Sequence, residues 1–197
     1  MRLAFIFSIL FCSMSLPLIA EETMTFDMFL YKDKIGYLTV TKKKVNDSSE
    51  IYTLTSNSKA KILWMEYDNQ SSHEVTYING KLFKSTHKEV QNGKVKRWTN
   101  IKWDGKAYQV DGYKGKWAIN EAATHSIATL YFKDVRNVKR LFCDTDGAFV
   151  DFKNIGVSMY EFKAPDGTRN VYEYENGKLK RMEFHVSIAT VRAERRP

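Results

Sequence analysis

The sequence predicts a mainly β protein: a strongly curved antiparallel meander sheet, or half-barrel, with one short helix packed on its apolar face. Two observations support this fold class. Asn79-Gly80, Asn92-Gly93 and Asp104-Gly105 have the composition of hairpin turns, because a type I′ turn needs positive φ at both central residues. Around these turns apolar and polar residues alternate, which is typical of strands with one buried face.

The predicted turns also define a register. If each dipeptide is the whole loop, Tyr77 faces Leu82, and His87 faces Trp98. The core-facing side then contains Val75, Tyr77, Leu82, Val90, Val95, Ile101, Trp103, Tyr108 and Val110. The opposite side contains Glu74, Phe83, Ser85, His87, Glu89, Trp98, Asn100, Gln109 and Asp111. A one-residue slip at a turn would exchange the two sides.

Residues 1–20 have the pattern of a secretory signal peptide. Arg2 precedes an apolar run from Leu3 to Leu16, which is short for a transmembrane span, and Ala20 precedes two glutamates. The alternative is an uncleaved N-terminal anchor. We expect cleavage, a single β-rich domain over residues 21–197, no remaining transmembrane span, and a periplasmic or secreted location.

The mature chain would keep one cysteine, Cys143, which excludes an intramolecular disulfide. Its apolar neighbours favour a buried, inert thiol over a reactive nucleophile. The formal net charge is +8, with lysines spread over strands and turns. They favour solubility, or attraction to anionic lipid headgroups or acidic glycans. Because an exported protein does not meet nucleic acid in the cell, we do not expect a nucleic-acid partner.

The remaining elements follow from turn chemistry and periodicity. An opening hairpin spans 24–31 and 37–45, and residues 51–67 form one long strand or two with a bend, ending in a turn at 68–71. Asn120 could cap a helix from 121 to 132, with an apolar stripe that includes Ala123, Ile127, Leu130 and Tyr131. Later strands are expected at 138–143, 148–152, 156–164, 168–175 and 178–191, followed by a solvated tail at 192–196.

The histidines give little support for a metal site. The register places His73 and His87 on opposite faces, so they would not bind one ion together. His125 and His185 have no second histidine at ligand spacing. We therefore predict no metal and no cofactor.

Catalytic motifs are also absent from the sequence. There is no Gly-x-Ser-x-Gly elbow and no glycine-rich phosphate loop. Glu74, Glu89 and His87 share the polar face and could perform acid–base chemistry. Charges on strands more often form solvated pairs, here Glu89 with Lys96. We expect that the protein is not an enzyme.

Aromatic residues provide the candidate ligand site. Trp103 and Tyr108 flank the third turn on the core side, near one mouth of the sheet. They would line an apolar pocket if the helix does not fill that mouth. The predicted ligand-binding residues are Trp103, Tyr108, Tyr77, Ile101 and Tyr131.

Three segments resemble known proteins: Phe29-Leu30-Tyr31 through Ile35-Gly36-Tyr37, the hairpin over 74–82, and 172–179 with Met182 and Phe184. They resemble an exported bacterial family of unknown function with a curved antiparallel half-barrel. More distantly, the chain is similar to periplasmic lipoprotein carriers, which bind acyl chains in such a half-barrel. The resemblance implies the fold and a lipid-like ligand, and it implies no catalytic residues.

These observations favour a non-enzymatic binding module for an apolar ligand, a lipid-like moiety or an apolar segment of a partner. An envelope structural or interaction protein, which would use a sheet edge or the basic surface, is the alternative. A third hypothesis is a hydrolase or isomerase that acts through Glu74, Glu89 and His87.

Overall fold

A computed structural model describes residues 20–62, 64–186 and 189–197. The predicted signal peptide lies outside the described residues, except for Ala20. The strands are β1 (Glu21–Leu30), β2 (Asp33–Asn46), β3 (Ser49–Ile62), β4 (Met65–Ile78), β5 (Lys81–Gln91), β6 (Lys94–Trp103), β7 (Tyr108–Gly112), β8 (Gly115–Ile119), β9 (Arg140–Cys143), β10 (Ala148–Gly156), β11 (Met159–Lys163), β12 (Arg169–Glu175), β13 (Lys178–Val186) and β14 (Ala189–Arg195). One 3-10 turn, η1 (Ile127–Tyr131), precedes β9.

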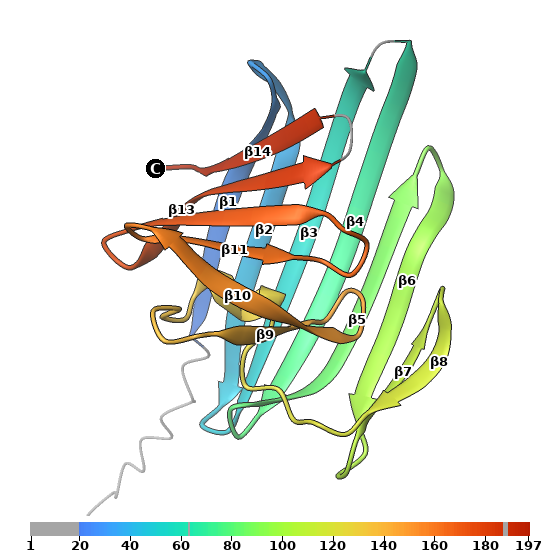
Figure 1. Ribbon diagram of the computed structural model, residues 1–197, viewed down its shortest axis with the longest axis vertical. Coiled ribbons are helices and arrows are strands. Elements are labelled where there is room, and N and C mark those ends of the chain that lie inside the picture. The colour runs from blue at the N-terminus through green and yellow to red at the C-terminus, as the bar shows by residue number, and fades with distance from the viewer. Residues whose placement is uncertain (1–19, 63, 187–188) are drawn as a thin grey trace, which may run out of the picture.

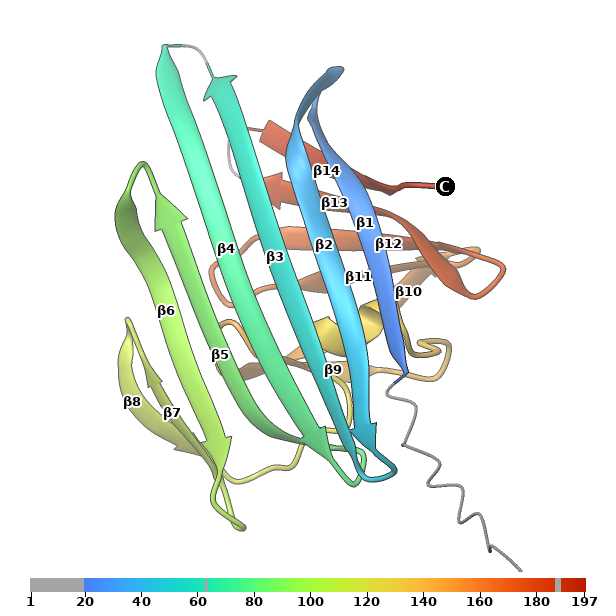
Figure 2. The same cartoon turned by 180° about the vertical axis from the view of Figure 1, so that it is seen from behind.

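All strands belong to one antiparallel 14-stranded sheet, in the order β8-β7-β6-β5-β4-β3-β2-β1-β14-β13-β12-β11-β10-β9. Strands β9–β14 lie across one face of β1–β8, so the sheet forms two layers that meet where β1 pairs with β14 (Figures 1 and 2). The apolar core lies between them and includes Phe26, Tyr52, Tyr172 and Met182. The predicted mainly β antiparallel fold is confirmed. The predicted strongly curved half-barrel is wrong, because the sheet is open and not strongly curled.

The helix predicted over 121–132 is also wrong: the described residues contain the 3-10 turn η1 and no α-helix. Tertiary contacts occupy the backbone groups that a helix would use. The carbonyl of Ala123 accepts a hydrogen bond from β5, and that of His125 accepts one from β9, both at 2.9 Å. The Thr129 hydroxyl bonds the backbone N–H and carbonyl of Ser126. The segment still lies between the layers, as Figure 2 shows.

The Asn-Gly turns have the predicted conformation. Asn79, Asn92 and Asn176 have φ of 50, 51 and 52°, and the glycine after each has φ of 74 or 75°. The third predicted turn is longer: the Asp104 carboxylate accepts hydrogen bonds from the N–H groups of Lys106 and Ala107 at 2.8 and 2.9 Å. As a result Trp103 pairs with Tyr108, whereas a two-residue loop at Asp104-Gly105, as predicted, would pair Trp103 with Lys106 and is wrong.

Each Asn-Gly turn is followed by a β-bulge in the strand that leaves it. The extra residues are Phe83 in β5, Lys96 in β6 and Lys180 in β13. Pairs next to the turns are as predicted, including Tyr77 with Leu82. Beyond each bulge the register moves by one residue, because two residues oppose one. His87 therefore pairs with Thr99, and the predicted His87–Trp98 pair is wrong.

The bulge at Phe83 exchanges the two faces of β5. Ser85 and His87 are buried, although they were predicted on the polar outer side. Lys84 and Lys88, which the uninterrupted register would turn inward, are exposed. On the predicted core side, burial is found for Val75, Tyr77, Leu82, Ile101, Tyr108 and Val110, whereas Val95 is exposed.

Three other boundaries differ from the predictions. The turn predicted at 68–71 is part of β4, and the chain reverses between β3 and β4, beside Trp64. The last strand predicted over 178–191 is two paired strands, β13 and β14. The tail predicted at 192–196 is also ordered, since β14 pairs with β1 and Arg196 contacts the Asp27 carboxylate at 2.7 Å.

The backbones of β2 and β3 approach each other closely at Gly36. A Cβ at this position would lie 2.0 Å from the carbonyl oxygen of Asn57, so the backbone would have to move. We expect Gly36→Ala to lower the free energy of unfolding by about 1–3 kcal/mol in urea titrations. The control is Gly156→Ala, where the nearest atom lies 3.8 Å away; its effect should stay below about 0.5 kcal/mol. Equal losses for the two variants would contradict this packing.

Candidate functional site

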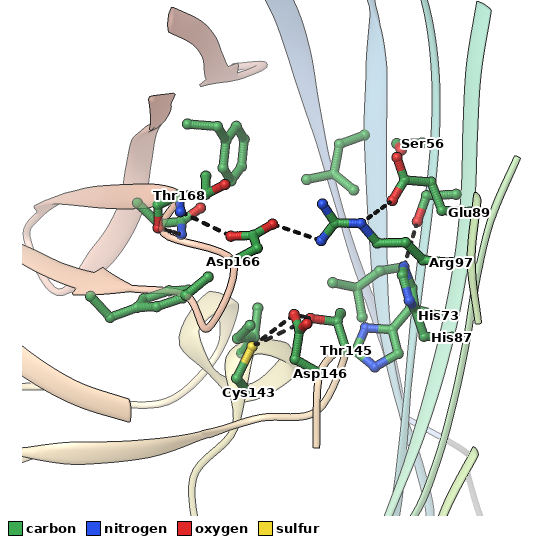
Figure 3. Close-up of a pocket in the computed structure, with 18 of the residues that line it drawn as sticks. Ser56, His73, His87, Glu89, Arg97, Cys143, Thr145, Asp146, Asp166 and Thr168 are labelled. Carbon is green, nitrogen blue, oxygen red and sulfur yellow. Dashed lines mark hydrogen bonds and ion pairs between the residues drawn. The ribbon is translucent and has the colours of Figure 1, made fainter. Parts of the chain in front are cut away.

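A cavity of about 340 Å³ lies between the two sheet layers. Figure 3 shows that its lining side chains come from both layers. The apolar part of the lining includes Leu38, Leu54, Tyr131, Phe162 and Phe184. The polar part includes His87, Glu89, Arg97, Thr145, Asp146 and Asn170. The volume lies at the lower end of the range that is usual for small-molecule sites.

The bulge in β5 places His87 and Glu89 in the polar part of this lining, and the second layer supplies Thr145, Asp146 and Asn170. Beyond Phe83, alternate residues of β5 face the other layer, and these are Ser85, His87 and Glu89. Glu89 pairs with Arg97 on β6. Exposure rises along this line, since Ser85 is 0% and His87 9% exposed, whereas the Arg97 side chain is 35% exposed. The mouth of the cavity therefore lies at Arg97, near the turn between β5 and β6.

An ion pair connects the two layers at this mouth. The Arg97 Nη1 lies 2.7 Å from Oδ2 of Asp166, in the turn between β11 and β12, and its Nε lies 3.6 Å from Oε2 of Glu89 (Figure 3). Burial opposes ionisation of Asp166, but the Thr168 N–H and the Arg97 guanidinium hold its pKa below the ordinary value. The predicted pairing of Glu89 with Lys96 is wrong, because Glu89 pairs with Arg97 and Lys96 is the extra residue of the bulge.

His73 and His87 form a contact pair deeper in the cavity. Their ring centroids lie 5.6 Å apart, with an interplanar angle of 82°. The prediction that they lie on opposite faces is wrong, because the bulge at Phe83 brings them into direct register. Burial lowers the pKa of both to about 4, so both imidazoles are neutral at pH 7.

Asp144 lies behind His73 and is fully buried. Its Oδ1 is 3.7 Å from Nε2 of His73, and neither carboxylate oxygen has a hydrogen-bond partner among the described residues. Burial raises the pKa of Asp144 to about 7. At neutral pH this carboxyl is therefore only partly ionised beside the histidines.

The histidines do not form a serine-protease-like triad. Ser85 Oγ lies 3.1 Å from Nε2 of His73, and Asp144 approaches the same nitrogen. A triad needs the acid on Nδ1 and the nucleophile on Nε2. Of the predicted acid–base set, His87 and Glu89 line the cavity, whereas Glu74 is exposed on the outer face.

The described residues contain no group of three histidine, cysteine or acidic side chains arranged to hold a metal ion. Cys143 is buried, as expected, and its thiol donates to the Asp146 carboxylate at 3.6 Å. Burial raises the pKa of this thiol, which keeps it protonated and unreactive.

Residues 26–196 match the family model described as a domain of unknown function (DUF6134). The chain belongs to this DUF6134 family. No curated protein and no solved structure matches it. Within the described residues, no helix has the length and apolar character to cross a lipid bilayer. The family match confirms the resemblance to a family of unknown function. The family description gives no activity for the cavity.

Of the five ligand-binding residues predicted for this DUF6134 protein, Tyr131 lines the cavity. The other four lie in the core beside it. Tyr108 is fully buried, and its hydroxyl donates to the Leu82 carbonyl at 2.9 Å. Trp103 packs on Tyr108 with a centroid separation of 4.8 Å. Tyr77 and Ile101 are each 1% exposed.

The sequence named His87 and Glu89 as a possible acid–base set, but on the outer face. His73, Arg97 and Asp166 were not predicted as site residues, nor was Asp144, which lies behind them. One sequence signal bears on the inward position of His87 beside His73. The three Asn-Gly turns are each followed by Lys and then Leu or Val, and each is followed by a bulge at the same position. This repeated pattern is the sequence feature that marks the register shift.

The buried Asp144 carboxyl gives a pH-dependent prediction. The folded protein holds its proton up to a pKa of about 7, whereas an ordinary aspartate has a pKa of 3.8. Between these two pKa values the folded state binds a proton that the unfolded state has released. The free energy of unfolding therefore falls as pH rises from about 4 to about 7. Asn cannot ionise, so Asp144→Asn should gain stability relative to the native protein between about pH 4 and pH 8, by roughly 2–4 kcal/mol.

Urea titrations over this pH range measure the effect. The control is Asp151→Asn, an exposed carboxylate on β10. Its stability difference from the native protein should be nearly independent of pH. A pH-independent difference for Asp144→Asn as well would show that Asp144 is not a buried acid.

Proposed function

We propose that this protein is an exported, non-enzymatic binding module that holds a small amphipathic molecule between its two sheet layers. One observation carries the proposal: the cavity has an apolar part and a polar part that face the same space. An apolar body would lie against Leu54, Tyr131 and Phe184. A polar head would meet His87 and Asn170. This refines the expectation of a purely apolar or lipid-like ligand.

The charges of the side chains around the cavity restrict the charge that the polar head of the ligand can carry. The histidines of the cavity are neutral at pH 7, because burial lowers the pKa of His73 and His87 to about 4. Arg97 already contacts Asp166 and Glu89. An anionic head would therefore meet uncompensated negative charge, whereas a hydroxyl or an ammonium would not. The supported ligand class is an aliphatic or aromatic molecule with a neutral or cationic head.

The alternative interaction role through a sheet edge has weaker support. The edge strands β8 and β9 have 5 and 4 residues. Short edge strands are one way in which proteins discourage the addition of another strand. Export, through the predicted signal peptide, and the absence of an enzymatic activity are part of the proposal.

A displacement assay tests the ligand class. The purified protein is loaded with the fluorescent apolar probe N-phenylnaphthylamine and titrated with dodecanol, dodecylamine or dodecanoate, which share one chain and differ in the head. We expect dodecanol and dodecylamine to displace the probe at concentrations at least about tenfold lower than dodecanoate, a difference of roughly 1.4 kcal/mol. No probe uptake, or a preference for dodecanoate, would contradict the proposal.

A cavity-filling variant locates the binding. Ala164 lines the cavity, so Ala164→Trp should fill it and weaken probe binding by about tenfold or more. The control is Ala118→Trp on the exposed face of β8, which adds the same side chain outside the cavity. Equal probe binding by the two variants would place the probe elsewhere on the protein.

A further inference from the structure

We propose that one end of the β1–β8 layer docks on an anionic lipid surface. The chain reverses at this end between β1 and β2, between β3 and β4, and between β5 and β6. Figure 1 shows this end at the top, with the end of β3 and the start of β4 projecting furthest. We call this end the docking edge and define it by Tyr31, Lys32, Trp64, Lys94, Val95 and Lys96.

Large apolar side chains are exposed along the docking edge. Trp64 is 78% exposed, Tyr31 71% and Val95 52%. The position of Val95, two residues after an Asn-Gly turn, does not by itself cause its exposure. At the same position after the other two Asn-Gly-Lys turns, Leu82 and Leu179 are 1% and 0% exposed. Tryptophan and tyrosine are enriched where a protein meets the headgroup region of a bilayer, because their rings have apolar bodies and polar tips.

The lysines of the docking edge favour an anionic surface, and they outnumber the two exposed carboxylates at this end, Asp33 and Glu66. Lys32, Lys94 and Lys96 are exposed, and none of them forms an ion pair within the described part of the chain. Lysines held close to a membrane are attracted by acidic headgroups. The formal net charge of +8 has the same sign. Exposed rings flanked by free lysines therefore fit an acidic lipid surface better than an uncharged partner.

The docking edge also lies beside the mouth of the cavity. Glu89 and Arg97 form that mouth, and the pair Gln91–Lys94 closes the same hairpin. A docked protein would thus hold the mouth near the bilayer. The role of docking in bringing the cavity mouth to the bilayer rests on the proposed ligand-binding function. The docking itself does not rest on it.

Vesicle binding tests the apolar contacts. The full chain without residues 1–20 is floated with vesicles of phosphatidylglycerol and phosphatidylcholine, or of phosphatidylcholine alone. We expect binding to the acidic vesicles, with a blue shift of tryptophan emission. Trp64→Ala should remove most of this shift. The matched control Trp98→Ala, which removes an exposed tryptophan from the middle of β6, should keep it.

Charge reversal tests the position of the surface. Lys94→Glu with Lys96→Glu should weaken vesicle binding by about tenfold or more. The control is Lys81→Glu with Lys106→Glu at the opposite end of the layer; Lys81 follows Asn79-Gly80 as Lys94 follows Asn92-Gly93. It should change binding less than about twofold.

Three outcomes would overturn the proposal: equal losses for the two lysine pairs, an unchanged blue shift in Trp64→Ala, or preferential binding to an acidic polysaccharide without a blue shift. The last would indicate a polyanion site. Ala164→Trp should keep vesicle binding, so failure of the cavity proposal and failure of the docking proposal give different results.

Discussion

A one-residue bulge after each Asn-Gly turn decides which side chains face the space between the layers. In β5 the extra residue is Phe83, and it turns Ser85 and His87 inward. Without it, Lys84 and Lys88 would face the core, and burial of unpaired ammonium groups is strongly unfavourable. The bulge therefore keeps Leu82 buried next to the turn while Lys84 and Lys88 stay in solvent, and it places His87 and Glu89 in the cavity lining.

Polar side chains on the inward side of β6 attach the first layer to the second. The Thr99 hydroxyl donates to the Thr145 carbonyl at 2.7 Å, and Arg97 reaches Asp166 at 2.7 Å. Beside these contacts the space between the layers is apolar, where the Tyr131 ring of η1 packs on the Phe26 ring of β1 with a centroid separation of 5.8 Å. The interface is thus polar at the mouth and apolar beside it. A cavity with one polar and one apolar side follows from this division.

Local signals in the sequence predicted the turns and the inward side of β6 and β7, where Ile101 and Tyr108 are buried. Turn chemistry determines only the nearest pairs, so the bulge at Phe83 and the contact of His73 with His87 were missed. The segment 121–132 has helical composition, but hydrogen bonds from distant strands replace its helical ones. Local patterning also gives no signal for contacts between the layers.

The titration of His73 and His87, followed by NMR with His87→Gln for assignment, tests the bulge-shifted register most directly. The register buries both imidazoles in one contact pair. We expect both to titrate near the pKa of about 4 that burial gives them. On the uninterrupted register His87 would lie on the solvated outer face and titrate near its ordinary value of about 6.5. That result would contradict the register and, with it, the polar side of the cavity.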